Sequence, residues 1–529
     1  MTSSSRPILD LSALREELLP AIERGMPIAF WARLMPDQPA IVAPAGSRTF
    51  AQLNARTNQL VRALRSRGLV AGDSIALMCG NRPEFAEVLW ATRRAGWRIT
   101  PLNWHLTAEE AAYVIDNCDA KAFLVEGRFA EVARLVSTAA PGATVRVAIG
   151  TSMDGYTDYE ALLSGQDEHD IEDPEPGTAM LYTSGTTGRP KGVFRAVLPT
   201  APPPSTIAAA YQPGAHVHLC AGPLYHAAPL SFSLLTPGTY GATIVMMDGW
   251  DAEKALQLIE KHWVTHTHMV PTMFHRLLSL PIEVRDRYNL SSLEYVLHGA
   301  APCSVPLKQA LIDWLGPVVY EYYAATEGSG TFVDSSTWLS LPGTVGKPPT
   351  SDHILIMDDA GNELGPNAVG TVYLKAPDVG RFTYYKDDGK TAQAYRGNYY
   401  TLGDMGYLDA EGYLYLTDRS AHLIISGGVN IYPAEVEAVL LTHPAIADVG
   451  VIGVPNAEWG EEVKAVATLN PGYAPSRQLG NELIDHCRTK LAHFKCPRSI
   501  DFVTSLPRQD NGKLYKQKLR EEYRKRASA

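Results

Sequence analysis

Hydrophobic positions along the first half of the chain follow two different spacings. The segment 52–67 repeats leucine and valine at helical intervals, and Gly68 ends it. Short apolar runs at Ser74–Met78 and Val145–Ile149 predict buried strands. Strands that alternate with amphipathic helices are typical of parallel βαβ units, so the pattern predicts an α/β fold.

The pattern changes twice in the second half. From about residue 354, short strands are separated by turn signals, which predicts a small β-rich unit. After residue 418, two strands and helices near 434–441 and 479–491 follow one another. We therefore predict a large N-terminal domain, residues 1–418, of βα-layered sheets plus a small β-barrel-like unit. A small α+β C-terminal domain, residues 419–529, follows it.

Composition and charge exclude several classes of protein. The chain has 529 residues, of which 45% are hydrophobic and 20% charged, which is typical of globular proteins and not of disordered ones. Its net charge of −10 argues against a protein that coats nucleic acid. Six cysteines without a Cys-x-x-Cys pair argue against a zinc or disulfide scaffold and indicate a reducing, cytoplasmic location.

No segment is typical of membrane insertion. The N-terminus lacks the apolar core of a secretory signal. Residues 196–247 contain no Asp, Glu, Lys or Arg, but prolines interrupt them too often for a membrane span. This segment instead predicts a buried interior, which would suit an apolar ligand. The basic C-terminal tail is interpreted as a solvated helix face, with contact to CoA phosphates or a membrane surface as the alternative.

The segment after Tyr182 has the composition of a phosphate-binding loop. Glycines let backbone N–H groups approach a phosphate, hydroxyl groups add donors, and a lysine adds positive charge. The chain has no G-x-x-x-x-G-K-[ST] motif, so this is not a P-loop. The residues concerned are Thr183, Ser184, Gly185, Thr186, Thr187, Gly188 and Lys191.

This loop resembles the signature of the adenylate-forming superfamily, which comprises acyl-CoA synthetases, peptide-synthetase adenylation domains and luciferases. Further motifs resemble that family in order, so that the resemblance covers about residues 30 to 520. They are Gly299-Ala300-Ala301-Pro302, Tyr323-Ala324-Ala325-Thr326-Glu327-Gly328, Tyr400-Thr401-Leu402-Gly403-Asp404, Asp418-Arg419, Ile425–Ile431 and Pro507-Arg508-x-x-x-Gly512-Lys513.

The resemblance implies a two-step reaction and a set of catalytic residues. A carboxylate attacks the α-phosphate of ATP, which gives an acyl-adenylate and pyrophosphate, and a thiol then displaces AMP. Two anions meet in the first step, so Lys513 is expected to bridge them. Thr326 is expected to donate to the α-phosphate, and Glu327 is expected to hold Mg²⁺. The implied cofactors and co-substrates are ATP, Mg²⁺ and coenzyme A.

The resemblance also implies nucleotide and thiol contacts. Asp404 is expected to accept hydrogen bonds from the ribose, with Arg419 supporting the same region. The other expected contacts are Gly299, Ala300, Ala301 and Tyr323 beside the nucleotide, the 183–191 loop on the β- and γ-phosphates, and Gly427 and Gly428 at the pantetheine tunnel. The C-terminal domain is expected to be mobile, because it must rotate between the two steps.

Three histidines leave alternatives open. His226 lies inside the uncharged segment, and it is either a satisfied core residue or, as the family implies, a group beside the acyl carboxylate. His266 and His268 alternate on a predicted strand, and the absence of Cys, Asp or Glu at ligand spacing favours core residues over a metal site.

Two positions depart from the family pattern. Ala324 replaces the usual glycine, which is a mild change if its backbone φ is negative. Ala421 stands where the family has Asp or Lys at the hinge, and the effect of this change is left open.

The sequence predicts an ATP-dependent acid–CoA ligase for an apolar acid, with medium- and long-chain fatty acids favoured. Alternatives are a ligase with a different acceptor and a CoA ligase for aryl or polycyclic acids. A peptide-synthetase adenylation domain, a luciferase-like oxygenase and a non-catalytic binder also remain. The expected partners are small molecules, no nucleic acid is expected, and a homodimer is left open.

Overall fold

The computed structural model describes residue 9 and residues 11–183, 190–196, 211–419, 422–426, 429–456, 459–508 and 512–527. The chain divides into two compact units. Unit 1 comprises Met1–Met269, Ser279–Leu297 and Pro377–Ala392, and unit 2 comprises Val270–Leu278, His298–Ala376 and Gln393–Ala529. Each unit therefore combines segments that are far apart in the sequence.

The first sheet of unit 1 is parallel throughout. Its strand order is β7-β6-β5-β3-β4-β8. The strands are β3 (Ser74–Met78), β4 (Arg98–Pro101), β5 (Ala120–Glu126), β6 (Val145–Ile149), β7 (Thr157–Asp158) and β8 (Thr178–Ala179). The α-helices of residues 50–163 are α3 (Phe50–Arg65), α4 (Pro83–Arg94), α5 (Ala108–Asn117), α6 (Ala130–Ala139) and α7 (Tyr159–Leu163). The predicted βαβ units are confirmed.

Unit 1 contributes six strands to a second sheet, in the order β14-β13-β11-β12-β1-β2. They are β1 (Pro39–Ala43), β2 (Gly46–Thr49), β11 (Val217–Cys220), β12 (Thr243–Met246), β13 (His266–Met269) and β14 (Tyr295–His298). The accompanying helices are α1 (Leu11–Glu23), α2 (Pro27–Leu34), α8 (Ala227–Pro229), α9 (Thr236–Thr239), α10 (Ala252–His262) and α12 (Ile282–Arg285).

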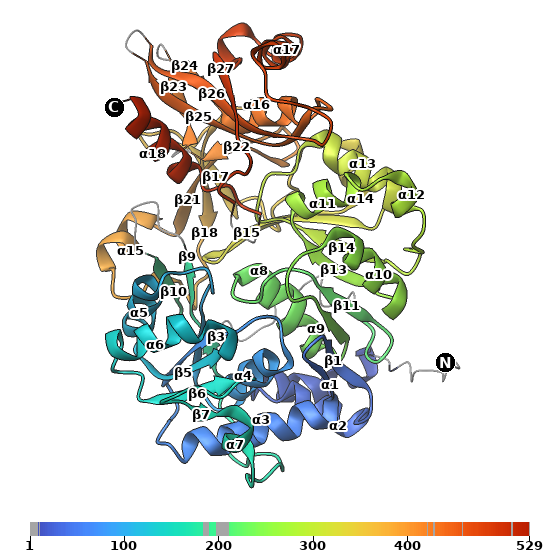
Figure 1. The fold of residues 1–529 in the computed structure, drawn as a ribbon, viewed down its shortest axis with the longest axis vertical. Coiled ribbons are helices and arrows are strands. Elements are labelled where there is room, and N and C mark those ends of the chain that lie inside the picture. The colour runs from blue at the N-terminus through green and yellow to red at the C-terminus, as the bar shows by residue number, and fades with distance from the viewer. Residues whose placement is uncertain are drawn as a thin grey trace. The chain divides into compact units, whose positions relative to one another are not determined.

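One hydrophobic core serves both sheets. Ile75 of β3 and Ile244 of β12 belong to the same cluster of buried side chains as Trp90 of α4. Helix α4 is buried on nearly every face, as expected of a helix that is covered on all sides. Figure 1 shows α4 among the elements of the two sheets. The uniformly apolar strands of the sequence are therefore explained by burial on both faces.

Unit 2 begins with helices and a hairpin, followed by a five-stranded antiparallel sheet. The first group comprises α11 (Pro271–Leu278), α13 (Val305–Leu315), β15 (Val319–Ala325), β16 (Gly328–Val333) and α14 (Ser335–Ser340). The sheet comprises β17 (Ile354–Met357), β18 (Gly370–Lys375), β20 (Tyr395–Arg396), β21 (Tyr399–Leu408) and β22 (Leu414–Arg419). The sheet is the β-rich unit that the turn signals predict.

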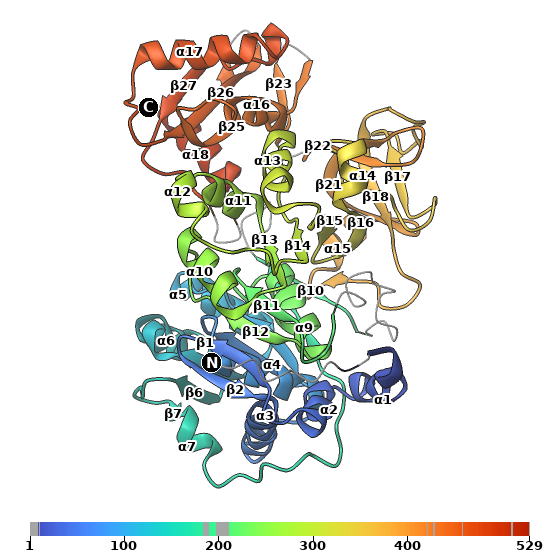
Figure 2. The same cartoon turned by 90° about the vertical axis from the view of Figure 1, so that its right-hand side faces the viewer.

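The C-terminal part of unit 2 is a sheet with helices on both faces (Figure 2). Its elements are β23 (Ile424–Ser426), β24 (Val429–Ile431), α16 (Pro433–Leu440), β25 (Ile446–Asn456), β26 (Gly460–Leu469), α17 (Arg477–Arg488), β27 (Ser499–Phe502) and α18 (Lys516–Ala527). Val451 of β25 packs with α16 and α17, whereas Ile452 packs with α18. Successive strand residues point to opposite faces, so β25 serves both layers.

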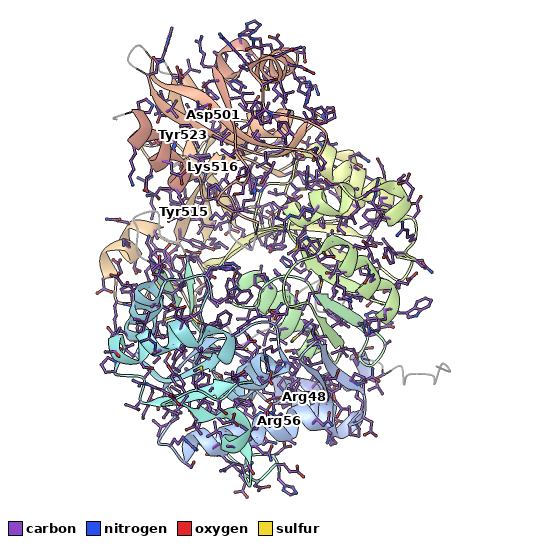
Figure 3. All side chains as sticks on the ribbon, viewed as in Figure 1. Arg48, Arg56, Asp501, Tyr515, Lys516 and Tyr523 are labelled. Atoms are coloured by element: carbon purple, nitrogen blue, oxygen red, sulfur yellow. The ribbon has the colours of Figure 1, made fainter. Side chains whose placement is uncertain are left out.

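The buried carboxylate of Glu87 is neutralised by residues from distant segments. The carboxylate of Glu87 is fully buried and accepts hydrogen bonds from Arg48 Nε and Arg56 Nε, both at 2.7 Å. Tyr159 Oη donates to its second oxygen at 2.8 Å. The two arginines lie close together (Figure 3). An unpaired buried carboxylate would be strongly destabilising, so these contacts fix α3 against α4.

A buried group of histidines lies on neighbouring strands of the second sheet. His218 of β11 contacts Tyr211 Oη at 2.7 Å and Ser233 Oγ at 3.0 Å. His266 of β13 stacks on the Tyr211 ring, with 4.5 Å between ring centroids. Burial lowers the pKa of His218, and it lowers the pKa of His268 to about 3. The side chains of His218 and His268 are therefore neutral in the folded protein.

Within the described residues, no helix is long and apolar enough to cross a membrane. The described part of the uncharged segment forms β11, β12 and the short helices between them. All six cysteines are free thiols.

The buried histidines predict acid destabilisation. In the unfolded chain a histidine titrates near pH 6.5, whereas the folded His268 resists protonation, so stability is greatest above that pH. Below it, each such histidine removes about 1.4 kcal/mol from the free energy of unfolding per pH unit. We expect His268→Gln to reduce this slope by about that amount, measured by urea unfolding at a series of pH values.

His169→Gln is the matched control, because His169 is a surface histidine with a side chain 86% exposed. It should leave the slope below pH 6.5 close to that of the wild type. Equal slopes for wild type and His268→Gln would show that burial of His268 does not cause the acid sensitivity.

Candidate active site

The two ends of the predicted phosphate loop are held together by a strand pair in unit 1. In the antiparallel pair of β9 (Leu181–Thr183) and β10 (Lys191–Phe194), Thr183 lies opposite Lys191. Strand β10 also pairs with β19 (Thr383–Tyr384), and the Lys191 ammonium lies 4.8 Å from the centroid of the Tyr384 ring. Ser184, Gly185, Thr186, Thr187 and Gly188 lie outside the described residues.

A buried tyrosine–carboxylate pair organises the predicted nucleotide residues of unit 2. Tyr323 of β15 donates its hydroxyl proton to Asp404 Oδ2 of β21 at 2.7 Å. Both side chains are buried, and each is 8% exposed. A hydrogen bond to a charged acceptor is stronger than a neutral one. The structure therefore joins two motifs that are far apart in the sequence.

Thr326 and Glu327 form the turn between β15 and β16. Glu327 is buried. A Cβ atom at Gly328 would lie 2.0 Å from the Tyr400 hydroxyl of β21, so only glycine fits there. The turn that carries Glu327 is thus packed directly on the strand that carries Asp404. Ala324 belongs to β15 and is not among the described residues with positive φ. The replacement of the family's usual glycine by alanine is therefore a mild change at this position.

The Gly299–Ala301 loop follows β14 and lies close to β15. A Cβ atom at Gly299 would lie 2.6 Å from the Tyr322 ring, which explains the glycine. Ala300 has φ +66°, a conformation that costs energy for a residue with a side chain. Such local strain is concentrated at functional loops in proteins, so Ala300 supports a functional interpretation of the loop.

A buried ion pair joins α13 to β15. Lys308 of α13 donates to Glu321 Oε2 of β15 at 2.7 Å, and the Lys308 side chain is fully buried. Burial raises the pKa of Glu321, while Lys308 opposes that shift. The pair fixes α13 against the strand that also carries Tyr323. Sequence reasoning missed it, because no motif contains either residue.

The predicted catalytic lysine follows a clamped loop in unit 2. Arg508 donates to both carboxylate oxygens of Asp448 at 2.5 and 2.6 Å, and to the carbonyl oxygen of Gly512 at 2.6 Å. Gly512 has φ +77°, and a Cβ atom there would lie 2.1 Å from Thr272 Oγ1 of α11. The backbone just before Lys513 is therefore fixed by Arg508, and it packs on α11.

His226 lies in unit 1, at the start of a continuous helical stretch. Helix α8 continues into the π-helical segment Leu230–Leu235 and then into α9. The His226 ring is half-buried, and its centroid lies 4.5 Å from that of Tyr225. π-Helical turns are frequent at functional sites. The surroundings agree with either expected role for His226, and the choice stays a prediction.

Metal binding by protein groups alone is not indicated. Among the described residues, no three His, Cys, Asp or Glu side chains form a group that could hold a metal ion. Magnesium is commonly held by one or two carboxylates together with substrate phosphates. A single buried carboxylate such as Glu327 fits that mode.

Several predicted positions are not described. Gly427, Gly428 and Ala421 lie outside the described residues, and so does the side chain of Arg419. The Arg419 backbone lies opposite Asp404 in the β21–β22 pair. The expected boundary between residues 418 and 419 stays a prediction.

Comparison with known proteins gives two matches to family models. The model described as AMP-binding enzyme matches residues 28–385, and the model described as AMP-binding enzyme C-terminal domain matches residues 435–513. The expected boundary at residue 419 lies between the two matched segments.

Curated relatives match along nearly the whole chain. The fatty acid–[acyl-carrier-protein] ligase ScoC of Streptomyces coeruleorubidus is 31% identical over 508 residues, which cover 94% of this chain and 95% of ScoC. The 2-succinylbenzoate–CoA ligase of Bacillus licheniformis is 34% identical over 493 residues, covering 92% and 98%. The structure of the anthranilate CoA ligase AuaEII with anthranoyl-AMP has a TM-score of 0.85 at 24% identity and covers 100% of both chains, which shows the fold.

The buried ion pair generates a stability prediction. Lys308→Met should lower the free energy of unfolding by about 3–5 kcal/mol, because it leaves the Glu321 carboxylate buried without its partner. The double variant Lys308→Met/Glu321→Leu should recover most of this loss. Urea unfolding of the three proteins measures both effects.

Lys375→Met is the control, since the Lys375–Asp352 pair has side chains 41% and 55% exposed. Its removal should cost about 1 kcal/mol or less. If Lys308→Met and Lys375→Met lower the free energy of unfolding by the same amount, the buried pair does not hold α13 against β15 as argued.

Proposed function

Because the chain belongs to the adenylate-forming family of AMP-binding enzymes, we propose that it is an ATP-dependent acid–CoA ligase for an apolar carboxylic acid. The proposal covers two steps. The acid attacks the α-phosphate of ATP, which gives the acyl-adenylate and pyrophosphate. The CoA thiol then attacks the acyl carbonyl and releases AMP.

The buried Tyr323–Asp404 pair, with Glu327 on the adjoining turn, is the observation that carries the proposal. The Asp404 carboxylate would accept hydrogen bonds from the ribose. Tyr323 orients that carboxylate and reduces the cost of its burial. Gly299, Ala300 and Ala301 would line the nucleotide on the adenine side, because their loop packs on the strand that carries Tyr323.

The first step requires that two anions approach one another. Lys513 would bridge the carboxylate and the α-phosphate, and Thr326 would donate its hydroxyl to that phosphate. Glu327 would hold Mg²⁺, which neutralises phosphate charge when it is bound. Thr183 and Lys191 would contact the β- and γ-phosphates from unit 1. Arg508 acts on Lys513 indirectly, because it fixes the carbonyl oxygen of Gly512.

An apolar acid is favoured by the interior of unit 1. Residues 211–247 are described and contain no Asp, Glu, Lys or Arg, and many of them are buried. Ala227 and Ala228 are small and would leave room for an extended acyl group beside His226. A substrate with a second carboxylate would need a basic partner, which this segment does not supply. We therefore favour medium- and long-chain fatty acids, with aryl or polycyclic monocarboxylic acids as the alternative.

The acceptor has one specific alternative. ScoC, which matches nearly the whole chain, is named as a ligase for an acyl-carrier protein. A carrier protein presents its acyl group on the same pantetheine thiol that CoA carries, so the chemistry is shared. The six free thiols support a reducing compartment, and we propose a cytoplasmic location.

ATP–pyrophosphate exchange with a panel of acids tests the substrate class. We expect exchange to be fastest with unbranched fatty acids of about eight to sixteen carbons, and at least about tenfold slower with succinylbenzoate, because its second carboxylate would be desolvated without a cation. Thioester formation with CoA and with an acyl-carrier protein is measured in parallel. Exchange confined to dicarboxylates would contradict the proposed acid class.

Lys513 generates a second prediction, on the two half-reactions. Lys513→Ala should slow adenylate formation by about 100-fold or more, as expected when one preorganised charge is removed. A supplied acyl-adenylate should still react with CoA at a rate within a few-fold of the wild type. Lys518→Ala is the matched control, since Lys518 is an exposed lysine on α18. Equal losses in both half-reactions would contradict the assigned role.

A further inference from the structure

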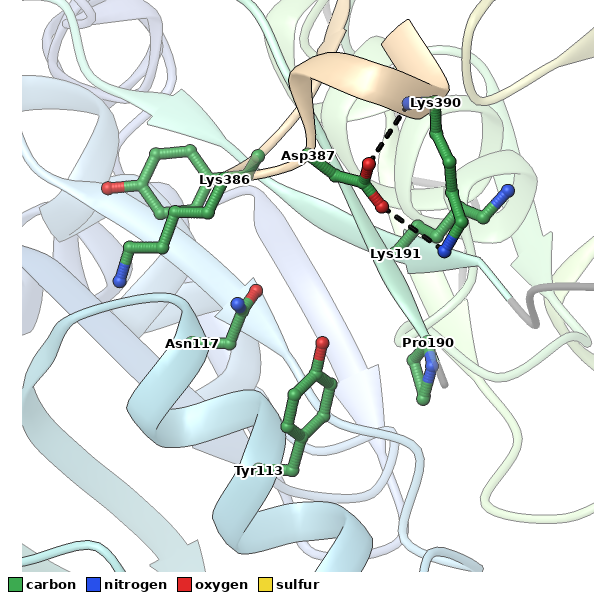
Figure 4. A pocket seen from close by; sticks show the side chains of 8 residues that line it. Tyr113, Asn117, Pro190, Lys191, Lys386, Asp387 and Lys390 are labelled. Atoms are coloured by element: carbon green, nitrogen blue, oxygen red, sulfur yellow. Dashed lines mark hydrogen bonds and ion pairs between the residues drawn. The ribbon is translucent and has the colours of Figure 1, made fainter. Parts of the chain in front are cut away.

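Helix α5 of unit 1 ends at a pocket in which two lysines are paired with carboxylates. Asn117 of α5 lines this pocket together with Lys386 and Lys390 (Figure 4). The Lys386 ammonium lies 2.7 Å from Asp119, and the Lys390 ammonium lies 3.1 Å from Asp387. The charges of these two lysines are therefore compensated within the protein. The opposite end of α5 follows a loop of a different character, because aromatic rings gather there.

Trp104 lies in the loop between β4 and α5, and its ring contacts rings from two other loops. Its centroid lies 4.7 Å from that of Tyr225, and the two ring planes are 85° apart. It also stacks on Phe129, with 6.0 Å between the centroids. The Tyr225 centroid in turn lies 4.5 Å from that of His226. Edge-to-face and stacked rings attract one another, so Trp104 orients Tyr225, and Tyr225 contacts His226.

These loops share one place in the topology of unit 1. Trp104 follows β4 and Phe129 follows β5 in the first sheet, whereas Tyr225 follows β11 in the second. Strands β4 and β5 are parallel to β3, and β11 is parallel to β12 and β13. Open α/β sheets bind ligands outside the carboxyl ends of their strands. The aromatic rings therefore gather at the edge where such sheets bind ligands.

The backbone before Tyr225 is fixed by a buried asparagine. Asn81 follows β3 and is 2% exposed. Its Nδ2 atom donates to the carbonyl oxygen of Gly222 at 2.9 Å, and its Oδ1 atom accepts from the Leu224 N–H at 3.1 Å. An amide that is bonded through both of its polar atoms is held in one orientation. The Tyr225 side chain therefore starts from a fixed backbone, and the neighbouring rings decide how it is oriented.

Trp104 is itself held by a charged group. The Arg128 guanidinium lies 5.4 Å from the centroid of the Trp104 ring and 4.8 Å from that of Phe129. Its two Nη atoms donate to the Asp248 carboxylate at 2.6 and 3.0 Å, and its Nε atom lies 3.0 Å from Glu126. A cation near the face of an aromatic ring attracts that ring. The two carboxylates keep the cation in place, and the cation stabilises the orientation of Trp104.

We propose that Trp104 is a positioning residue for the acid: it orients Tyr225 and, through Tyr225, holds the His226 ring beside the acyl carboxylate. The inference rests on the proposed function, which places His226 there. A displacement of about 1 Å can slow a reaction by about 100-fold, so the orientation of His226 affects the rate with the acid. Affinity for ATP depends on other residues, because those proposed for the adenine and the ribose belong to unit 2.

ATP–pyrophosphate exchange at varied acid and varied ATP concentration tests this role. Trp104→Ala should lower kcat/KM for the acid by about tenfold and leave KM for ATP within about twofold of the wild type. Trp104→Phe should recover most of the loss, because a phenyl ring keeps an aromatic contact with Tyr225. Trp263→Ala is the matched control, since Trp263 is a tryptophan of the same unit that is 65% exposed. A loss that Trp104→Phe does not recover, or an equal rise in KM for ATP, would overturn the proposal.

A double-mutant cycle separates positioning from a purely structural role. If Trp104 acts through His226, Trp104→Ala should lower kcat/KM for the acid by less than about twofold in a His226→Ala background, because the group that it positions is already gone. Additive losses, or a His226→Ala variant with the kcat/KM of the wild type, would overturn the proposal. Trp104→Leu takes the place of Trp104→Ala if thermal unfolding shows that the alanine variant is not folded, since leucine keeps apolar volume but has no ring.

The orientation of His226 is also measured without catalysis, by NMR of the protein with isotope-labelled histidine. The signal that disappears in His226→Gln identifies His226. Its ring protons should shift in Trp104→Ala, because the Tyr225 ring beside them is no longer held, and they should stay in place in Trp263→Ala. If this shift is present but no acid supports exchange in the wild type, the proposed function fails and the positioning of His226 by Trp104 stands. If the shift is absent, the proposal is overturned.

Discussion

The hydrogen bond between Tyr323 and Asp404 is the interaction on which the described site in unit 2 depends most. It joins β15 to β21 across 81 residues of sequence, and both partners are buried. A carboxylate at that depth without a donor would cost several kcal/mol. Because the turn with Glu327 also packs on β21 through Gly328, one constraint fixes the metal-binding candidate and the ribose-binding candidate together.

Three further carboxylates of the described chain are paired in the same way. Glu87, Glu321 and Asp448 each meet a basic partner from another element, at distances of 2.5 to 2.7 Å. The segment 211–247 differs, because it contains no Asp, Glu, Lys or Arg that would need a partner. Burial lowers the pKa of its His218, so that this side chain is neutral as well. These three carboxylates are thus paired with basic groups, whereas the segment 211–247 carries no formal charge.

Arg508 connects the backbone next to Lys513 to the C-terminal sheet. Asp448 belongs to β25, the strand that packs against α16, α17 and α18. The root of the Lys513 loop is therefore tied to the core of the C-terminal sheet. The contacts of Arg508 with Asp448 and with Gly512 would have to break if the Gly512 backbone moved without that sheet.

The sequence by itself determined the elements and the family. Ser74–Met78 and Val145–Ile149 are strands with the predicted bounds, because burial on both faces leaves an uninterrupted apolar run. The motifs from Thr183 to Lys513 identified the family, which the family models confirm. The tertiary structure alone decided the partners: Lys308 with Glu321, Arg508 with Asp448, and Lys191 with Lys386 and Lys390 around one pocket. Local spacing encodes which face of an element is buried, but it carries no information on which distant charge will meet that face once the chain has folded.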